Sequence, residues 1–258
     1  MPITPHGLLG RLFHKGVLAR WQAATAAAGK TRRTILRAQR YQARQLKSVL
    51  QEFCHTADDR LALPHSGSTT FAKPVGTDWS WRPTLWRLRS DQPGHAPVFD
   101  KTQFGDEIGI FHDCPMSEIT VRQVRNQRDT DIAPFGITME VFHFGGSYLS
   151  VVVDLPVDAC ANLRKQHLIQ LSALIEKDRP AKIFARLNIK NGPNTAQITK
   201  TLPDDIDASD VVDFDLAYTE LNEKRAERMW VDLIFDTPTM NKITLRDLTF
   251  SRYPRAQI

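Results

Sequence analysis

Cysteine is scarce in this sequence of 258 residues, and the few cysteines are widely spaced. They are Cys54, Cys114 and Cys160, an odd number with no CxxC motif and no short Cys/His spacing. Such a set argues against a zinc knuckle and against a scaffold held by disulfides. We therefore predict no metal site, and we expect a reducing, cytoplasmic location.

Long hydrophobic runs are also lacking. No stretch approaches the roughly 18 consecutive apolar residues that a transmembrane helix needs. The N-terminal stretch interrupts its apolar residues with Arg11, His14, Lys15 and Arg20, whereas a secretory signal peptide has an unbroken apolar block. We expect neither a transmembrane helix nor a signal peptide, which leaves peripheral attachment to a membrane open.

Familiar catalytic motifs are absent as well, since there is no HExxH, no GxSxG and no glycine-rich phosphate loop. The most suggestive stretch is "FHDC", residues 111–114. A thiol nucleophile needs a base and an orienting third group, but on a strand His112 and Cys114 share one face while Asp113 points to the other. We therefore predict a non-catalytic protein without a cofactor. An alternative is an enzyme with an unrecognised site that uses His112, His143 or Cys114.

Acidic residues are rare in the first 60 positions. This segment contains eleven Lys and Arg residues and three acidic residues, Glu52, Asp58 and Asp59, which gives it a net charge of +8. The whole chain carries +5, so the remainder carries −3. This asymmetry predicts a basic arm attached to a nearly neutral body.

The arm, residues 1–60, has the pattern of an amphipathic helical hairpin. Gly29 ends a first helical pattern, and Thr31 is placed to cap a second. The apolar stripe of the second helix consists of Ile35, Ala38, Leu46, Val49, Leu50 and Phe53. This stripe either packs on the body or lies on an anionic membrane. Nucleic acid is a less favoured partner, because Tyr41 alone offers base stacking in that helix.

Residues 61–99 form a segment rich in proline and tryptophan, which we call the strap. Its five prolines exclude long helices and central strands. Trp79 and Trp81 point the same way on an extended chain, and Trp86 follows closely. These indoles either make a stacking platform for a ligand or anchor the strap to a core, and the surrounding prolines favour anchoring.

Residues 100–258 show strand after strand, which predicts an antiparallel β-sandwich. In "ITMEVFHFGGSYLSVVVDLP" we expect a hairpin that turns at Gly145-Gly146 and pairs Phe142 with Leu149. The turn "KDRP" is expected to join the next two strands. In "VVDFDLAYTE" the alternation buries Val212, Phe214, Leu216 and Tyr218. A change of phase in the last strand predicts a bulge near Arg246–Asp247.

Two resemblances support this fold. The stretch "MWVDLIFDTPTMNKITLRDLTFSR" ends in a strand of the form I-x-L-x-D-L-x-F and resembles the galactose-binding-domain-like jelly rolls, which include many carbohydrate-binding modules. The whole chain resembles an uncharacterised alphaproteobacterial family through "GTDWSWRP", "FHDC", "FARLNIKNGPNT" and "DLAYTELNEKR". The first resemblance implies a jelly-roll sandwich and a saccharide ligand, and the second implies no known activity.

The candidate site lies on two strands of the sandwich. Arg186 and Asn188 point outward on one strand, and Trp230 and Asp232 point outward on another. If these strands share a sheet, they form a shallow site with one aromatic ring and several hydrogen-bonding groups. The alternative is an ordinary solvated face with a cross-strand ion pair.

We predict a binding module for a saccharide or glycoconjugate, with Trp79 and Trp81 as second-rank contacts. The runner-up function is a peripheral membrane or assembly protein that docks through residues 1–60.

Overall fold

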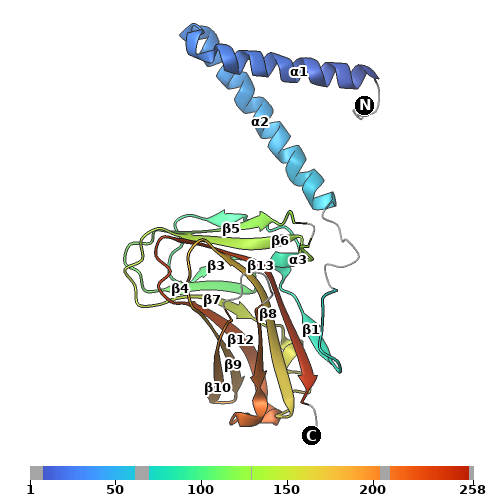
Figure 1. Cartoon of the computed structure of the whole chain (residues 1–258), viewed down its shortest axis with the longest axis vertical. Helices are drawn as coiled ribbons and strands as arrows, with labels where there is room; N and C mark the ends of the chain where they lie inside the picture. Colours follow the sequence, from blue (N-terminus) through green and yellow to red (C-terminus); the bar gives the residue numbers. More distant parts are fainter. Residues whose placement is uncertain (1–7, 62–69, 129, 204–209, 256–258) are drawn as a thin grey trace. The chain divides into compact units, whose positions relative to one another are not determined.

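The computed structural model describes residues 8–61, 70–128, 130–203 and 210–255. The chain divides into two compact units, Met1–Arg60 and Leu61–Ile258. Each unit is built from one kind of secondary structure, helices in the first and mainly strands in the second (Figure 1). The prediction of a mainly β protein with an N-terminal helical segment is confirmed.

The N-terminal unit contains α1 (Leu8–Ala27), η1 (Ala28–Lys30) and α2 (Arg33–Leu61). The Thr31 hydroxyl donates back to Ala27 O at 2.9 Å, so it closes the first helical segment. The first backbone bond of α2 runs from Leu36 N to Arg32 O, so Arg32 precedes the helix and the prediction that Thr31 caps it is wrong. No helix within the described ranges is both long enough and apolar enough to span a bilayer.

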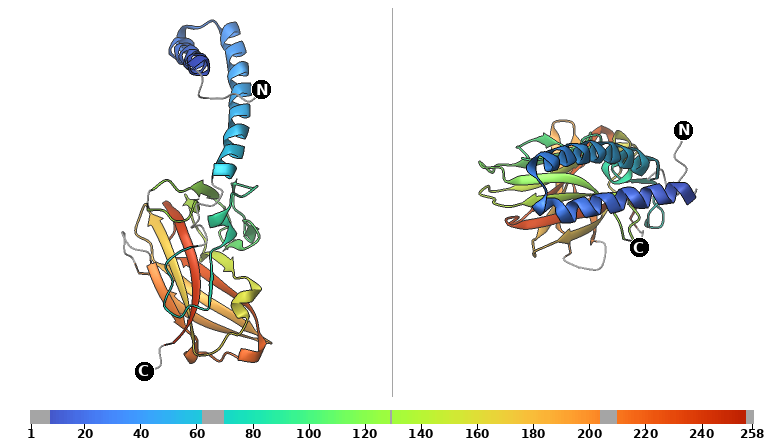
Figure 2. Two further views of the ribbon diagram at one scale, coloured as in Figure 1. Left: turned by 90° about the vertical axis from the view of Figure 1, so that its right-hand side faces the viewer. Right: turned by 90° about the horizontal axis from the view of Figure 1, so that it is seen from above.

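The second unit is a sandwich of two antiparallel sheets packed face to face (Figures 1 and 2). In the described part of the chain, the order of the seven-stranded sheet is β11 (Asp210–Asp215), β8 (His167–Lys177), β13 (Asn241–Pro254), β6 (Phe135–Val141), β5 (Ile119–Arg125) and β2 (Gly94–His95). Its seventh strand, β1 (Trp79–Trp81), pairs with β13 outside this order. The six-stranded sheet has the order β10 (Asn194–Thr201), β9 (Ile183–Asn191), β12 (Ala226–Phe235), β7 (Leu149–Asp154), β4 (Ile108–His112), β3 (Thr102–Gln103). Neighbouring strands are mostly distant in sequence, as in a jelly roll.

Within the residues that the structure describes, the connections contain four short helical turns. These are α3 (Thr84–Arg87), η2 (Val157–Cys160), η3 (Leu216–Tyr218) and η4 (Glu223–Arg225). The turn η3 explains one wrong prediction. The side chain of Asp215 accepts a bond from Ala217 N, which ends the strand. Tyr218 therefore leaves the alternation and is 81% exposed rather than buried.

The alternating strands bury the side chains that their patterns select. The residues expected in the core of β8, β9 and β12 are buried: Ile169, Leu171, Ala173, Ile175, Ile183, Ala185, Leu187, Ile189, Val231, Leu233 and Phe235. The predicted bulge is present in β13, where the register against β8 shifts between Leu245 and Asp247. The core thus follows from the period of two that a half-buried strand imposes.

One predicted connection between strands is wrong. β6 and β7 do not form a hairpin, because they lie in different sheets, and neither Gly145 nor Gly146 has a positive φ. The loop between them crosses the edge of the sandwich, where Phe142 N bonds to Glu118 O instead of pairing with Leu149. The "KDRP" segment joins β8 and β9 as expected, and it passes from one sheet to the other.

Candidate functional site

The four side chains expected on one sheet face lie together on the outer face of the six-stranded sheet. Strands β9 and β12 are antiparallel neighbours there, and their register places Trp230 opposite Asn188 and Asp232 opposite Arg186. The intervening residues on both strands are buried in the core. Because successive side chains of a strand point to opposite faces, these four residues are directed away from the core.

Asp232 is the centre of a hydrogen-bonded network on this face. Its Oδ2 accepts from Arg186 Nε at 2.8 Å, from Arg186 Nη2 at 2.7 Å and from Asn188 Nδ2 at 3.1 Å. Asn188 Oδ1 accepts in turn from Gln197 Nε2 on β10 at 2.9 Å. Asp232 and Asn188 are almost fully buried, whereas the Arg186 and Gln197 side chains reach solvent. Buried, partnered groups therefore hold two exposed polar groups in place.

Trp230 stands beside this network and is half-buried. Its register partners are Asn188 on β9 and Asp154 on β7. The guanidinium carbon of Arg228 lies 5.1 Å from the centroid of the indole ring, over one of its faces. Arg228 Nε also donates to Asp154 Oδ1 at 2.9 Å. The indole is thus positioned by a cation–π contact and by neighbours on both adjoining strands.

An apolar surface continues the same face of the sheet. Phe184 and Ile234 form the register pair beyond Arg186 and Asp232, and both are half-buried. On β4, the Phe111 ring lies across Gly109, where an added Cβ would be 2.7 Å from Phe111 Cε2. The missing side chain at Gly109 therefore lets this aromatic ring lie close to the sheet.

Sequence reasoning missed three of the residues that complete this arrangement, namely Gln197, Arg228 and Asp154. A signal for Gln197 was present, because Ala196 and Ile198 are the more buried residues of β10 and alternation directs Gln197 to the outer face. Its bond to Asn188 depends on the register between β9 and β10, which the sequence pattern does not give.

The other two candidates, Trp79 and Trp81, lie in the seven-stranded sheet and not with the first four. β1 pairs with β13, so that Trp79 is opposite Arg252 and Trp81 is opposite Phe250. Both indoles are half-buried and pack against the core, and the Trp81 and Phe250 ring centroids are 5.8 Å apart. Their packing is that of anchors for the strap, the alternative that the prolines favour.

Two bidentate ion pairs and a buried indole also fix the strap to β13. Arg252 donates from Nε and Nη2 to the two oxygens of Asp78 at 2.9 and 3.1 Å. Arg82 does the same to Asp247 at 2.9 and 2.8 Å. Burial raises the pKa of the Asp247 carboxyl above its usual value, although Arg82 opposes this. Trp86 is fully buried, and its Nε1 donates to a backbone carbonyl of β13 at 2.9 Å.

The "FHDC" stretch is built into the fold. Both ring nitrogens of His112 are used by the backbone: Nδ1 accepts from Cys114 N at 3.2 Å, and Nε2 lies 3.0 Å from Val98 O. Asp113 points elsewhere and accepts from the Ser147 hydroxyl and the backbone of the 145–148 loop. These bonds, first that of Ser147, lower the pKa of Asp113. The three side chains hold two loops in place and do not form a nucleophile–base–acid chain.

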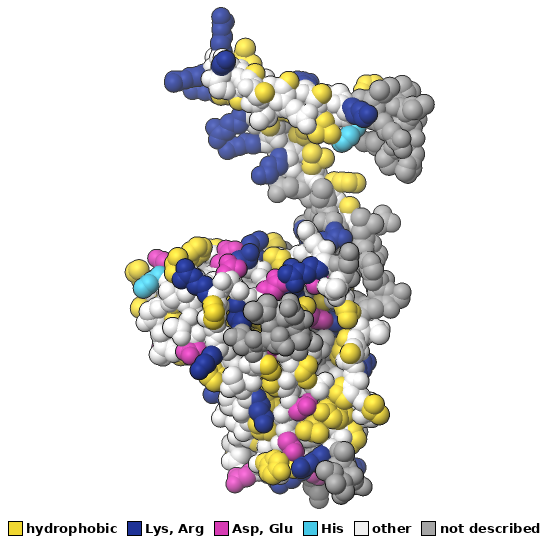
Figure 3. Space-filling model, in the orientation of Figure 1, with side chains coloured by type: hydrophobic (Ala, Val, Ile, Leu, Met, Phe, Trp, Pro, Cys, Tyr) yellow, Lys and Arg dark blue, Asp and Glu magenta, His cyan; other side chains and the backbone are white. Residues whose placement is uncertain are grey.

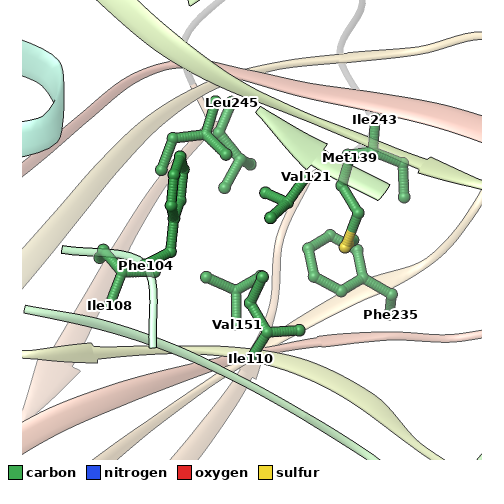
Figure 4. A pocket seen from close by; sticks show the side chains of 10 residues that line it. Phe104, Ile108, Ile110, Val121, Met139, Val151, Phe235, Ile243 and Leu245 are labelled. Atoms are coloured by element: carbon green, nitrogen blue, oxygen red, sulfur yellow. The ribbon is translucent and has the colours of Figure 1, made fainter. Parts of the chain in front are cut away.

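The sandwich unit has a small apolar cavity in its core and an open groove at its surface. Between the two sheets is a cavity of about 10 Å³, lined by apolar side chains that include Phe104, Ile110, Met139 and Phe235 (Figure 4). It is hardly larger than one water molecule, and such apolar cavities stay dry. An open, mixed-polarity groove of about 440 Å³ runs along the strap between α3 and β3. Glu107 in this groove accepts from Thr84 N and Thr84 Oγ1, which fixes the start of α3.

Within the residues that the structure describes, no group of three His, Cys, Asp or Glu side chains is placed to hold a metal ion. Cys160 is partly buried, and burial raises the pKa of its thiol. A raised pKa keeps a thiol protonated and unreactive at neutral pH.

A profile for one protein family matches residues 1–258, the full length of the chain. The chain belongs to this family of unknown function, DUF6478. No curated protein matches the DUF6478 chain.

Several solved structures are similar to it at low identity. A family 11 carbohydrate-binding module from Clostridium thermocellum, in complex with a β-1,3-1,4-mixed-linked tetrasaccharide, has 12% identity and a TM-score of 0.38, with 66% of this chain and 100% of that chain covered. A putative sugar binding protein from Bacteroides thetaiotaomicron has 10% identity and a TM-score of 0.36, with coverage of 62% and 95%. The enzymatically active domain of tailspike protein 4 from bacteriophage CBA120 has 8% identity and a TM-score of 0.39, and 55% of this chain covers 19% of that one.

Proposed function

We propose that the protein is a non-catalytic binding module that holds a saccharide or glycoconjugate on the outer face of the six-stranded sheet. The observation that carries this proposal is the placement of the Trp230 indole directly beside the partnered polar row of Arg186, Asn188 and Asp232. The apolar face of a sugar ring packs on an aromatic ring, and its hydroxyls need fixed donors and acceptors. This face supplies both within two neighbouring strands.

The residues of the site have separate roles in this proposal. Trp230 packs against a sugar ring, and Arg186 and Gln197 donate to hydroxyl groups at its edge. Asp232 and Asn188 are buried and hold those two side chains in position. Such prior ordering reduces the entropy lost on binding. The Phe184 and Phe111 rings offer apolar surface for a further sugar unit on the same face.

The test is a glycan-array screen of the full-length protein, followed by calorimetry with the glycan that binds. Trp230→Ala is expected to weaken binding at least about tenfold, because one well-packed aromatic contact contributes roughly 1.5 kcal/mol or more. Tyr218→Ala is the matched control. Tyr218 is also an exposed aromatic residue beneath a guanidinium, that of Arg255 at 5.6 Å, but it lies on η3 outside the candidate site.

Three outcomes contradict the proposal. The first is a folded protein that binds no glycan in the screen. The second is an equal loss of affinity in the Trp230→Ala and Tyr218→Ala variants, which indicates a nonspecific effect of removing an aromatic ring. The third is binding that survives Trp230→Ala but is lost with Trp79→Ala or Trp81→Ala, which moves the site to the strap.

A further inference from the structure

The helix α2 carries an apolar stripe that the saccharide proposal does not use. Five side chains recur at helical spacing on one side of it, within about 100° of arc. They are exposed by 37% to 67% of their area: Ile35, Leu46, Val49, Leu50 and Phe53. Leu46, Val49, Leu50 and Phe53 are neighbours on this side, and an exposed apolar surface of this kind marks an interaction site.

Five basic residues lie on the opposite side of α2. Arg33, Arg37, Arg40, Arg44 and Lys47 recur at helical spacing there, and all five are exposed. The first 51 residues of the sequence contain no Asp and no Glu, so this charge has no acidic neighbour along α1 or the first four turns of α2. Lys and Arg side chains accordingly gather along the N-terminal helices in the space-filling view (Figure 3). The surface calls for a partner that is both apolar and anionic.

We infer that α2 binds the surface of an anionic lipid bilayer and lies in the plane of the interface. In this position the apolar stripe enters the boundary between headgroups and acyl chains, and the basic side faces the headgroups. Long Arg and Lys side chains reach the headgroups while their aliphatic stems remain in apolar surroundings. Each basic residue near an anionic leaflet adds to the binding. The two sides of one helix thus match the two layers of one ligand.

The same surface is poorly suited to a second copy of the chain. A coiled-coil seam through Ile35 and Leu46 includes Gln39 and Gln42 at intervening core positions, which breaks the apolar repeat. A parallel second copy also brings the basic residues of the two helices together, because the acidic residues of α2 begin only at Glu52. Nucleic acid matches the basic side of α2, but it leaves the apolar stripe exposed to water. A bilayer satisfies both sides.

The test is co-sedimentation of the full-length protein with phosphatidylcholine vesicles and with vesicles that also contain about 30 mol% phosphatidylserine. We expect binding to the anionic vesicles only, and a loss of binding when NaCl is raised from about 0.1 M to about 0.5 M. Replacing Arg37, Arg40 and Arg44 by Gln is expected to weaken partitioning about 100-fold, at roughly fivefold per charge. The matched control replaces Lys182, Lys200 and Lys242, exposed on the sandwich, by Gln and leaves the partitioning unchanged.

A second variant tests the apolar stripe without a change in charge. The double variant Leu50→Ala, Phe53→Ala is expected to weaken partitioning about tenfold or more, because two large apolar side chains no longer enter the bilayer. Alanine is the strongest helix former, so α2 is retained, and circular dichroism confirms this. Equal binding to neutral and anionic vesicles overturns the proposal, as does binding to neither by folded protein. So does self-association, or binding to a DNA oligonucleotide, when vesicles are not bound.

Discussion

Arg186 and Asp232 face each other across β9 and β12, and both guanidinium nitrogens that reach the carboxylate bond to the same oxygen, Oδ2. The Nδ2 group of Asn188 donates to that oxygen too. Three donors therefore meet one oxygen of a carboxylate that is 4% exposed. Charge-assisted bonds of this kind are about twice as strong as neutral ones, so the geometry of the candidate site depends on the charge of Asp232.

We predict that Asp232→Asn lowers the free energy of unfolding by about 1–3 kcal/mol, because the neutral amide weakens three bonds in a place that water does not reach. The same variant is expected to reduce glycan binding by releasing Arg186 and Asn188. Asp154→Asn on β7 is the control, since its pair with Arg228 is exposed by 34% and 57% and such pairs contribute about 1 kcal/mol or less. Urea denaturation measures both, and equal losses in the two variants would refute the special role of Asp232.

The second prediction concerns the ion pair between Arg82 and Asp247, which fixes the strap to β13. The Arg82 side chain is fully buried, and Asp247 has little other solvation. Arg82→Met leaves the Asp247 carboxylate buried without its bidentate partner, at an expected cost of about 3 kcal/mol near neutral pH. At pH 4 the cost is expected to shrink, because burial already raises the pKa of Asp247 and the protonated carboxyl needs no cation. A cost that is the same at both pH values, from urea denaturation, would contradict this account.

The sequence predicted which residues of the sandwich are buried, but not which sheet each strand joins. Alternation in β8 and β9 correctly separates Leu171 and Leu187 from their outward neighbours. The same alternation is produced whether two successive strands pair with each other or face each other across the core. A short turn therefore predicts a hairpin at Gly145-Gly146, where the chain in fact passes to the other sheet.

The sequence predicts which side chains of the candidate site face outward, but not which of them are buried. The positions of Trp230 and Asn188 on outer faces follow from alternation, and the register of β9 and β12 then makes them neighbours. The burial of Asp232 does not follow from alternation, which also directs the more exposed Trp230 outward, and neither do its bonds to Arg186 and Asn188 on the adjacent strand. Contacts between strands far apart in sequence depend on register, which local patterns do not specify.

Trp86 allows a third prediction, on the packing of the strap. The indole has no exposed surface, and its Nε1 donates to Leu245 O, next to the β13 bulge. Trp86→Phe removes this bond, leaves a buried carbonyl unpaired and opens a small cavity, at an expected cost of about 2–4 kcal/mol. The half-buried Trp79 is the control, and Trp79→Phe is expected to cost about 1 kcal/mol or less, because less packed area is lost. Urea denaturation of both variants decides whether Trp86 is the stronger anchor.

His167 and Asp78 make the stability of the strap sensitive to acid, which is the fourth prediction. Nδ1 of His167 accepts from Arg164 N at 3.1 Å, so the proton is on Nε2, which lies 3.8 Å from Asp78 Oδ2. Burial lowers the pKa of His167, although Asp78 opposes this. For Asp78, burial acts to raise the pKa, but the hydrogen bond and the charge of Arg252 outweigh it, and the pKa is lowered.

Each shift has its own pH window. Because the folded state resists protonation of His167, the unfolded chain takes up a proton first as the pH falls below about 6.5, and stability decreases there. The contribution of Asp78 is present above about pH 3.8 and is lost as the pH falls through its lower, folded pKa. Urea denaturation between pH 7.5 and pH 3 measures the free energy of unfolding, and we expect two declines on the order of 1 kcal/mol or less each. His167→Gln should flatten the first decline, and Asp78→Asn should flatten the second. If His167→Gln loses stability between pH 7 and pH 5 as steeply as the wild-type protein, another group is responsible for the first decline.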